Sequence, residues 1–296
     1  ALDDPEGHPH VAAVKKYAEL VKEKTNGAAK VEVYPSSQLG NAADVVESLK
    51  NGTVEAFFSA VTWLGANETD FWLPGTLYLF RDQDHCREVH ESEQFRALAD
   101  KIKDEKGIRV LSMSYDRGPR HIISKSPIKT LEDLKGLKIR VPPQESWVNN
   151  FKLAETAPQP IPISETFTGL QQGVIEATEQ ASNWLYFNKY YTIAENITKS
   201  YHNYEQAGLF YSEQIFSSYP ENIQKALVEA SDEIVGYHNE LMAEDIKKSE
   251  EKMADEGITF HEVDLEKWQS YFKDLIPELA KQVGYSQDLV DSILKG

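Results

Sequence analysis

The fold class of this chain is decided by residues 31–60, VEVYPSSQLGNAADVVESLKNGTVEAFFSA. Residues 31–34 alternate in the manner of a strand and stop at a proline. A helical pattern through 45–49 ends at an Asn-Gly pair, and residues 54–60 again have the composition of a strand. This strand–helix–strand order predicts an α/β lobe with a mostly parallel sheet.

Similar patterns extend outward in both directions from this stretch. Upstream, apolar residues recur at helical spacing from Val11 to Val21. Downstream, strands are predicted at 108–114, 121–124, 137–141 and 174–178, and helices at 145–154 and 165–172. A long charged helix is predicted from Pro220 to about Glu256, followed by two short helices from Leu265. Because no Gly/Ser-rich linker is present, we expect ordered segments to cross between the lobes.

Charge and composition exclude several classes of partner. The 296 residues include 48 acidic and 31 basic side chains, for a net charge of −17. A nucleic-acid binder would need a basic surface, so neither nucleic acid nor an anionic membrane is an expected partner. No apolar run reaches the ~20 residues that span a bilayer. Cys86 is the single cysteine and forms no internal disulfide, and the N-terminus lacks the features of a signal peptide and resembles a processed end.

Motifs for catalysis, cofactors and metals are absent from the sequence. There is no Gly-x-Ser-x-Gly, Gly-x-Gly-x-x-Gly or phosphate-binding loop. His90 begins like a zinc-protease motif, but Gln94 stands where the second histidine should be. The spacing of His8, His10 and His85 does not suggest a ligand set either. We therefore expect no enzyme activity, no catalytic residue, no cofactor and no metal.

A positively charged segment stands out against the acidic background. Residues 117–140 hold seven basic and two acidic side chains, a local charge of +5 that suits attraction of a small anion. Arg140 alternates with Ile139 and Val141 in a strand that should be buried. A buried guanidinium needs a partner, and its planar geometry matches a carboxylate. That carboxylate belongs either to a ligand or to an internal Asp or Glu.

Several aromatic residues stand where ligands of α/β sheets usually bind. Trp63, Trp147 and Trp184 each lie just beyond a predicted strand or at the start of a helix. Most aromatic side chains are core residues instead, and this is the expectation for Phe57, Phe58, Trp268 and Phe272.

An ordered set of short motifs resembles one known family. The motifs are Lys24–Gly27, Val31–Gly40, Leu134–Arg140, Pro160–Pro162, Ser164–Glu165 and Gly169–Glu176. Their order and spacing are similar to those of the solute-binding proteins of TRAP (tripartite ATP-independent periplasmic) transporters. This family includes receptors for C4-dicarboxylates, sialic acid and ectoine, and the resemblance covers essentially the whole chain.

The resemblance implies a fold and a cellular setting. The fold would be α/β, two-lobed and like that of periplasmic binding proteins, with a ligand cleft between the lobes and a long lobe-spanning helix. Lobe I would comprise 1–117 plus about 206–247, and lobe II 118–205 plus about 248–296. The protein would be an exported periplasmic monomer that delivers its ligand to the permease subunits of a TRAP transporter. The family's first strand would lie immediately upstream of Ala1.

The resemblance also implies site residues. The arginine that clamps the ligand carboxylate falls on Arg140, and a second arginine falls on Arg120. The polar residue over the ligand falls on Gln180, although the stretch 176–180 lacks the family's glycine and asparagine. Further cleft positions fall on Trp63, Tyr204 and Glu205, and the acidic residue of ectoine-binding relatives falls on Asp4.

These residues suggest a ligand that carries both charges. Trp63, Trp147, Trp184 and Tyr204 offer faces for stacking, and Asp4 or Glu205 could pair with an ammonium group. The main expectation is therefore an aromatic or heterocyclic zwitterion, such as an amino acid or an ectoine-like compound, that is held by Arg140 and Arg120 as the lobes close. The alternatives are a dicarboxylate or sugar-acid receptor of the same family, a two-lobed hydrolase or lyase, and a sensor domain.

Overall fold

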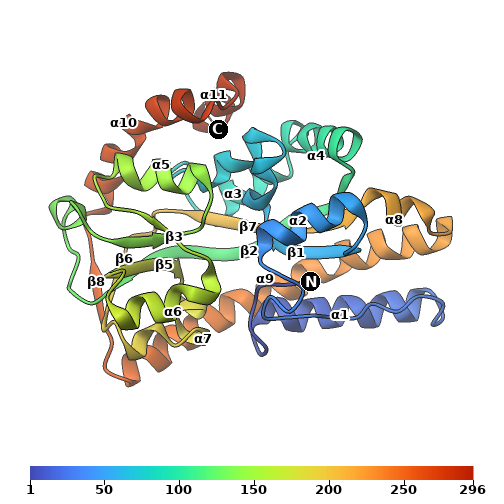
Figure 1. Ribbon diagram of the computed structural model, residues 1–296, viewed down its shortest axis with the longest axis horizontal. Helices are drawn as coiled ribbons and strands as arrows, with labels where there is room; N and C mark the ends of the chain where they lie inside the picture. Colours follow the sequence, from blue (N-terminus) through green and yellow to red (C-terminus); the bar gives the residue numbers. More distant parts are fainter. Residues whose placement is uncertain (296) are drawn as a thin grey trace. The chain divides into compact units, whose positions relative to one another are not determined.

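The computed structural model describes residues 1–295, and this part of the chain divides into two compact units (Figure 1). Strands β2 and β7 and helix α9 run from one unit into the other. Unit 1 comprises Ala1–Phe71, Arg87–Arg117 and Gln206–Glu244, and unit 2 comprises Trp72–Cys86, Gly118–Glu205 and Asp245–Gly296.

The segment 72–86 corrects the predicted lobe boundaries, since it was expected in lobe I and belongs to unit 2. Leu77 and Tyr78 are buried in the same hydrophobic cluster as Ile139. The amide of Tyr78 also donates to the carbonyl of His202 at 2.7 Å. Tertiary packing of this loop, which has no pattern visible in the sequence, therefore sets the boundary.

Unit 1 is built around a helix, an antiparallel strand pair whose members are far apart in the sequence, and part of the long helix. The burial of one face of α1 (Pro9–Lys24) against Phe58 of β1 and Leu209 of β7 forms its core. The helices and strands are α1, α2 (Ala42–Asn51), β1 (Ala56–Ala60), α4 (Glu93–Lys106), the first part of β2 (Ile108–Ser124), part of β7 (Tyr204–Ser212), α8 (Glu213–Ser218) and the first part of α9 (Glu221–Asp255). Helix α3 (Gln83–His90) belongs partly to each unit.

Two predictions for unit 1 were wrong. Residues 31–34 have no regular secondary structure, and β1 pairs with β7 in antiparallel rather than parallel orientation. The chain start lies beside both segments, because the amide of Leu2 donates to Tyr34 and the amide of Phe58 donates to the carbonyl of Ala1, each at 3.0 Å. A pocket of about 650 Å³, lined by these segments together with apolar side chains of α1, β7 and α9, lies here and contains none of the predicted ligand residues.

Unit 2 is organised around a mixed sheet. Strand β5 (Ala177–Ala181) pairs antiparallel with β2 (Ile108–Ser124) and parallel with β3 (Ile139–Val141). Strand β3 also pairs parallel with β4 (Gln159–Pro160), while β6 (Asn196–Lys199) pairs antiparallel with β2 and parallel with β8 (Thr259–Glu262). The predicted strands 108–114 and 121–124 are one continuous strand, and the strand predicted at 174–178 begins three residues later.

Helices cover both faces of this sheet, and Figure 1 shows α5 and α6 on opposite sides of β3 and β5. On one face α5 (Glu145–Leu153) and α10 (Leu265–Val283) pack against Ile139 and Val141. On the other face α6 (Ile163–Gln172) and α7 (Ser182–Phe187) pack against Ile123 and Ile197. Phe57, Phe58, Trp268 and Phe272 are buried, which confirms their prediction as core residues.

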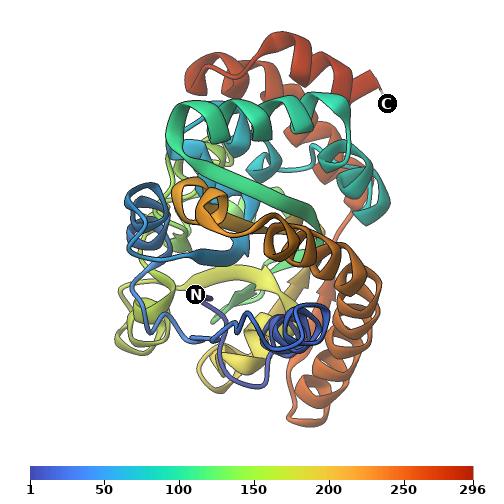
Figure 2. The same ribbon diagram turned by 90° about the vertical axis from the view of Figure 1, so that its right-hand side faces the viewer.

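The remaining helices follow the sequence patterns closely. Helix α9 spans 35 residues, near the predicted limits. Elsewhere in unit 2, Thr130 and Asp133 form a capping box at the start of the 3-10 turn Leu131–Leu134. The C-terminal pair is unequal, because α10 has 19 residues and α11 (Gln287–Lys295) has 9 (Figure 2). Across residues 1–295, no helix combines the length and the apolar character that crossing a membrane requires.

Gly118 of β2 has a backbone conformation that favours glycine. Its φ is +82°, and an added Cβ would collide with the side chain of Ile246. We expect Gly118→Ala to lower the free energy of unfolding by about 2 kcal/mol in urea titrations, because both strain and overlap oppose the methyl group. Gly236→Ala is the matched control: it lies in α9 with no atom near the new methyl group and should be neutral or stabilising. Equal effects of the two changes would contradict this account.

Candidate functional site

Arg140 lies at the centre of β3, with neighbouring strands on both sides. It is paired in register with Gln159 of β4 and with Thr178 of β5, and only 2% of it is exposed. Its Nε donates to the carbonyl oxygen of Ile161 at 2.8 Å. This bond fixes the plane of the guanidinium, and therefore the direction in which its two terminal nitrogens can pair with a carboxylate.

Polar side chains share the face of the sheet on which Arg140 lies. Thr178 is its register partner, and Gln180 follows two residues later on the same side of β5. Tyr190 lies close enough for the charge of Arg140 to act on its hydroxyl, although burial dominates and raises the pKa of Tyr190 to about 12. Arg140 therefore stands in a buried polar environment that includes an amide and two hydroxyl groups.

Arg120, on β2, is part of a separate ion network. Its Nε and Nη2 bind both carboxylate oxygens of Glu179 at 2.6 and 2.7 Å, and its Nη1 binds Glu205 at 2.8 Å. Nη2 also donates to the carbonyl of Glu179, so these bonds engage four of the five donors of a guanidinium. The ring of Trp147 covers the guanidinium at 4.6 Å from the ring centroid.

The network continues to a histidine and a serine. His202 Nε2 lies 3.2 Å from Oε2 of Glu179, and its Nδ1 is hydrogen-bonded to Ser200 Oγ at 2.7 Å. Burial raises the pKa of Glu179, but the charge of Arg120 and the hydrogen bonds from His202 and Arg120 together hold that pKa below its ordinary value. Burial lowers the pKa of His202, so this histidine is neutral near pH 7.

The strand register corrects the expectation that Arg140 and Arg120 act as a pair. Arg140 is opposite Thr178 and Arg120 is opposite Ala181, three positions further along β5. Side chains alternate between the two faces of a strand, so the two arginines lie on opposite faces of the sheet. Arg120 is held by two glutamates of the protein, and it belongs to the packing of strands β2, β5 and β7.

The other predicted residues of unit 2 are distributed between these environments. Glu205 and Trp147 contact Arg120, and Trp147 is fully buried in the cluster with Phe151 rather than presented as a free stacking face. Trp184 is buried on α7, and Tyr204, at the start of β7, is half-buried. The core position of Trp147 corrects its prediction as a ligand-facing aromatic.

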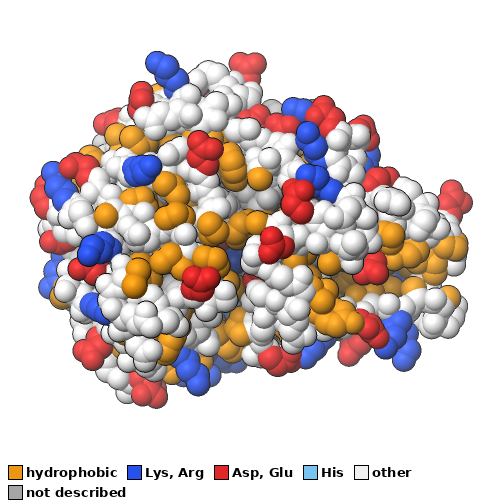
Figure 3. Space-filling view, in the orientation of Figure 1, with side chains coloured by type: hydrophobic (Ala, Val, Ile, Leu, Met, Phe, Trp, Pro, Cys, Tyr) orange, Lys and Arg blue, Asp and Glu red, His pale blue; other side chains and the backbone are white. Residues whose placement is uncertain are grey.

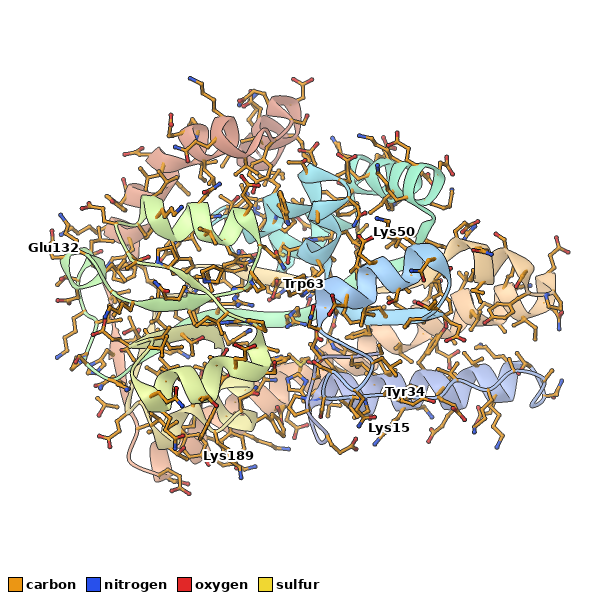
Figure 4. The ribbon with its side chains drawn as sticks, viewed as in Figure 1. Lys15, Tyr34, Lys50, Trp63, Glu132 and Lys189 are labelled. Carbon is orange, nitrogen blue, oxygen red and sulfur yellow. The ribbon has the colours of Figure 1, made fainter. Side chains whose placement is uncertain are left out.

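Asp4 and Trp63 belong to unit 1. Asp4 is 1% exposed, and its Oδ1 lies 2.6 Å from His10 Nδ1 and 3.4 Å from His8 Nδ1. Trp63 lies in the turn directly after β1 and is half-buried; Figure 4 labels it at that position. The carboxylate of Asp4 is thus engaged by imidazoles, which corrects its prediction as a partner for a ligand ammonium.

Sequence reasoning missed several polar residues of these clusters. Glu179 could have been predicted from the sequence. It is next to Gln180 in a strand and so faces the opposite side of the sheet, and a buried arginine on the neighbouring strand requires an acidic partner. His202 and Ser200 lie in an irregular connection that has no periodic pattern. Asp4, His8 and His10 are potential metal donors, and their convergence was not evident from their spacing.

Surface charge is dispersed around these buried sites. Arg117, Arg120 and Arg140, which contributed to the predicted positive field, are all buried. In Figure 3 the acidic and basic side chains on the visible face are scattered rather than gathered by sign. Three of the seven basic side chains of the predicted positive segment are therefore buried guanidinium groups rather than surface charges.

Comparison with known proteins identifies the class of protein. The family model described as bacterial extracellular solute-binding protein, family 7, matches residues 3–282. The chain belongs to this family of TRAP solute-binding receptors, which confirms the resemblance and the two-lobed α/β fold inferred from the sequence.

Among curated proteins, two relatives illustrate the range of solutes. The 2,3-diketo-L-gulonate-binding periplasmic protein YiaO of Escherichia coli is 30% identical over 84% of this chain and 75% of its own length. The C4-dicarboxylate-binding periplasmic protein DctP of Rhodobacter capsulatus is 28% identical over 96% of this chain and 85% of its own length.

Solved structures of TRAP periplasmic solute-binding proteins superimpose closely. The protein from Xanthobacter autotrophicus, with bound β-D-galacturonate, has a TM-score of 0.92 and 29% identity, covering 99% of this chain and 97% of that one. The protein from Actinobacillus succinogenes, with bound L-galactonate, has a TM-score of 0.92 and 26% identity, covering 100% and 97%.

The Arg120 network yields a stability prediction. We expect Arg120→Met to lower the free energy of unfolding by about 3–5 kcal/mol in urea titrations, because it leaves two buried carboxylates without their cation. Arg109→Met is the control: its bidentate pair with Glu213 is partly exposed, so a loss of about 1 kcal/mol is expected. A loss at Arg120 no larger than at Arg109 would remove the network from the determinants of stability.

Proposed function

We propose that this protein is the receptor of a TRAP transporter for a six-carbon sugar acid, a hexuronate or a related hexonate. It would bind the solute in the periplasm and deliver it to the membrane permease subunits. The single observation that carries the proposal is the buried guanidinium of Arg140, held in plane by Ile161 on a face rich in polar groups. A sugar acid supplies one carboxylate for the arginine and several hydroxyls for the polar groups around it.

The solutes of the relatives support this substrate class. β-D-Galacturonate, L-galactonate and 2,3-diketo-L-gulonate, named for the relatives compared above, each combine one carboxylate with several oxygen substituents on a six-carbon skeleton. A C4-dicarboxylate, the solute named for the Rhodobacter capsulatus protein, is the second candidate. It would need a second cation, and Arg120 already binds two glutamates.

The zwitterionic ligand expected from the sequence is less well supported. That expectation relied on Asp4 or Glu205 to pair with an ammonium group. Both carboxylates have partners within the protein, His10 and Arg120 respectively. The stacking surfaces are reduced as well, because Trp147 covers a guanidinium.

The substrate class can be tested by titration calorimetry on the purified protein. We expect D-galacturonate, D-glucuronate or L-galactonate to bind at least about tenfold more tightly than succinate, ectoine or any amino acid, since hydroxyl partners left unpaired reduce affinity. The methyl ester of galacturonate is the matched control, because it keeps the hydroxyls and loses the charge. Tightest binding of succinate or ectoine would contradict the proposal.

A conservative substitution tests the role of Arg140. Arg140→Lys keeps the charge but loses the planar pair of donors, so we expect affinity for the preferred sugar acid to fall about tenfold to one-hundredfold in calorimetry. Arg109→Lys changes an arginine of unit 1 that contacts Glu213 and should leave affinity unchanged. Unchanged affinity in a folded Arg140→Lys protein would exclude Arg140 from the binding site.

A further inference from the structure

Three potential metal donors converge in unit 1, apart from the proposed solute site. Asp4, at the start of the chain, lies beside His8 and His10 at the beginning of α1. One donor atom from each side chain lies within 4.8 Å of the other two, and all three residues are at most 1% exposed. This spacing, an aspartate followed by two histidines separated by one residue, brings three donors together through local chain geometry.

Hydrogen bonds already connect the three residues of this cluster. His8 Nδ1 accepts the backbone N–H of His10 at 3.2 Å, which requires that this nitrogen carry a lone pair rather than a proton. The same atom lies 3.4 Å from the carboxylate oxygen of Asp4, and a metal bound by His8 would take the lone pair that now accepts this backbone N–H. The one side-chain proton between the three residues is that on His10 Nδ1, which is directed at Asp4 at 2.6 Å.

The surroundings of His10 add an independent observation. The backbone of Asp116 forms a further hydrogen bond with the ring of His10. The same ring stacks on that of His238 at 5.0 Å, and Nε2 of His238 is buried without a hydrogen-bond partner. Unsatisfied buried nitrogens cost free energy, so a cluster of neutral imidazoles of this kind needs an explanation.

The charge balance of the cluster tolerates a cation. Burial lowers the pKa of His8 and His10 well below the ordinary value, so both imidazoles are neutral and able to act as ligands near pH 7. The positive charge of Arg117 also acts on both rings. This positive charge is opposed by the negative charges of Asp4 and Asp3. Burial raises the pKa of Asp3 to about 6, so Asp3 is ionised above that pH.

We propose that Asp4, His8 and His10 form a binding site for a late first-row divalent cation, with Zn²⁺ as the best-matched ion. Nitrogen and carboxylate donors suit this ion, and bond lengths of about 2.0–2.1 Å place tetrahedral ligands roughly 3.3 Å apart. The separation of 3.4 Å between Asp4 and His8 already matches that value. The contact of 2.6 Å between Asp4 and His10 opens by less than about 1 Å as the metal replaces the proton on His10.

Cobalt spectroscopy on the chelator-treated protein tests this site. After equilibrium dialysis with Co²⁺ we expect one ion per chain with the intense visible absorption of four-coordinate cobalt, removed by added Zn²⁺. Asp4→Asn and His10→Gln should each weaken metal binding at least about tenfold, as loss of a ligand does at minimum. His261→Gln, which changes a more exposed histidine hydrogen-bonded to Asn196, should have no effect.

A second measurement protects the test from misfolded variants. Zinc X-ray absorption of the wild-type protein should show two imidazole nitrogens and carboxylate oxygen at about 2.0–2.1 Å. A weak octahedral cobalt spectrum, a spectrum unchanged in folded Asp4→Asn and His10→Gln proteins, or a zinc shell of oxygen alone would each overturn the assignment. The sugar-acid titrations are independent of this site, so either proposal can fail alone.

Discussion

Alternation of side chains along β5 is the constraint on which the site depends. Consecutive residues of a strand face opposite sides of its sheet, so Thr178 and Gln180 face one layer of helices while Glu179 and Ala181 face the other. Arg140 lies on the same face of the sheet as its register partner Thr178, and Arg120 lies on the same face as its register partner Ala181. One strand thus separates the arginine that we propose binds the solute from an arginine paired with two glutamates of the protein.

The two arginines illustrate how burial assigns different roles to the same side chain. Arg120 is enclosed by Glu179, Glu205 and the ring of Trp147, an arrangement in which desolvation is offset only if every partner stays in place. Arg140 donates from Nε to a backbone carbonyl, which fixes the plane of its guanidinium.

Sequence patterns anticipated the regular parts of the structure well. Helices such as α1, α2 and α9 follow from apolar periodicity and caps, and the core positions of Phe58 and Trp268 follow from their patterns. The strand expected at 31–34 does not form, because strand formation requires a neighbouring backbone that local sequence does not specify. Assignment of 72–86 to unit 2 likewise depends on packing across long sequence separations.

The amino-acid sequence by itself determined the family and the α/β class, because ordered motifs and local periodicity are properties of consecutive residues. Only the tertiary structure decided the partners of the charged groups: Glu179 and Glu205 for Arg120, and His10 for Asp4. Those partners stand 59, 85 and 6 positions away along the chain. Electrostatic pairing depends on distance and burial in space, and a linear pattern carries neither quantity.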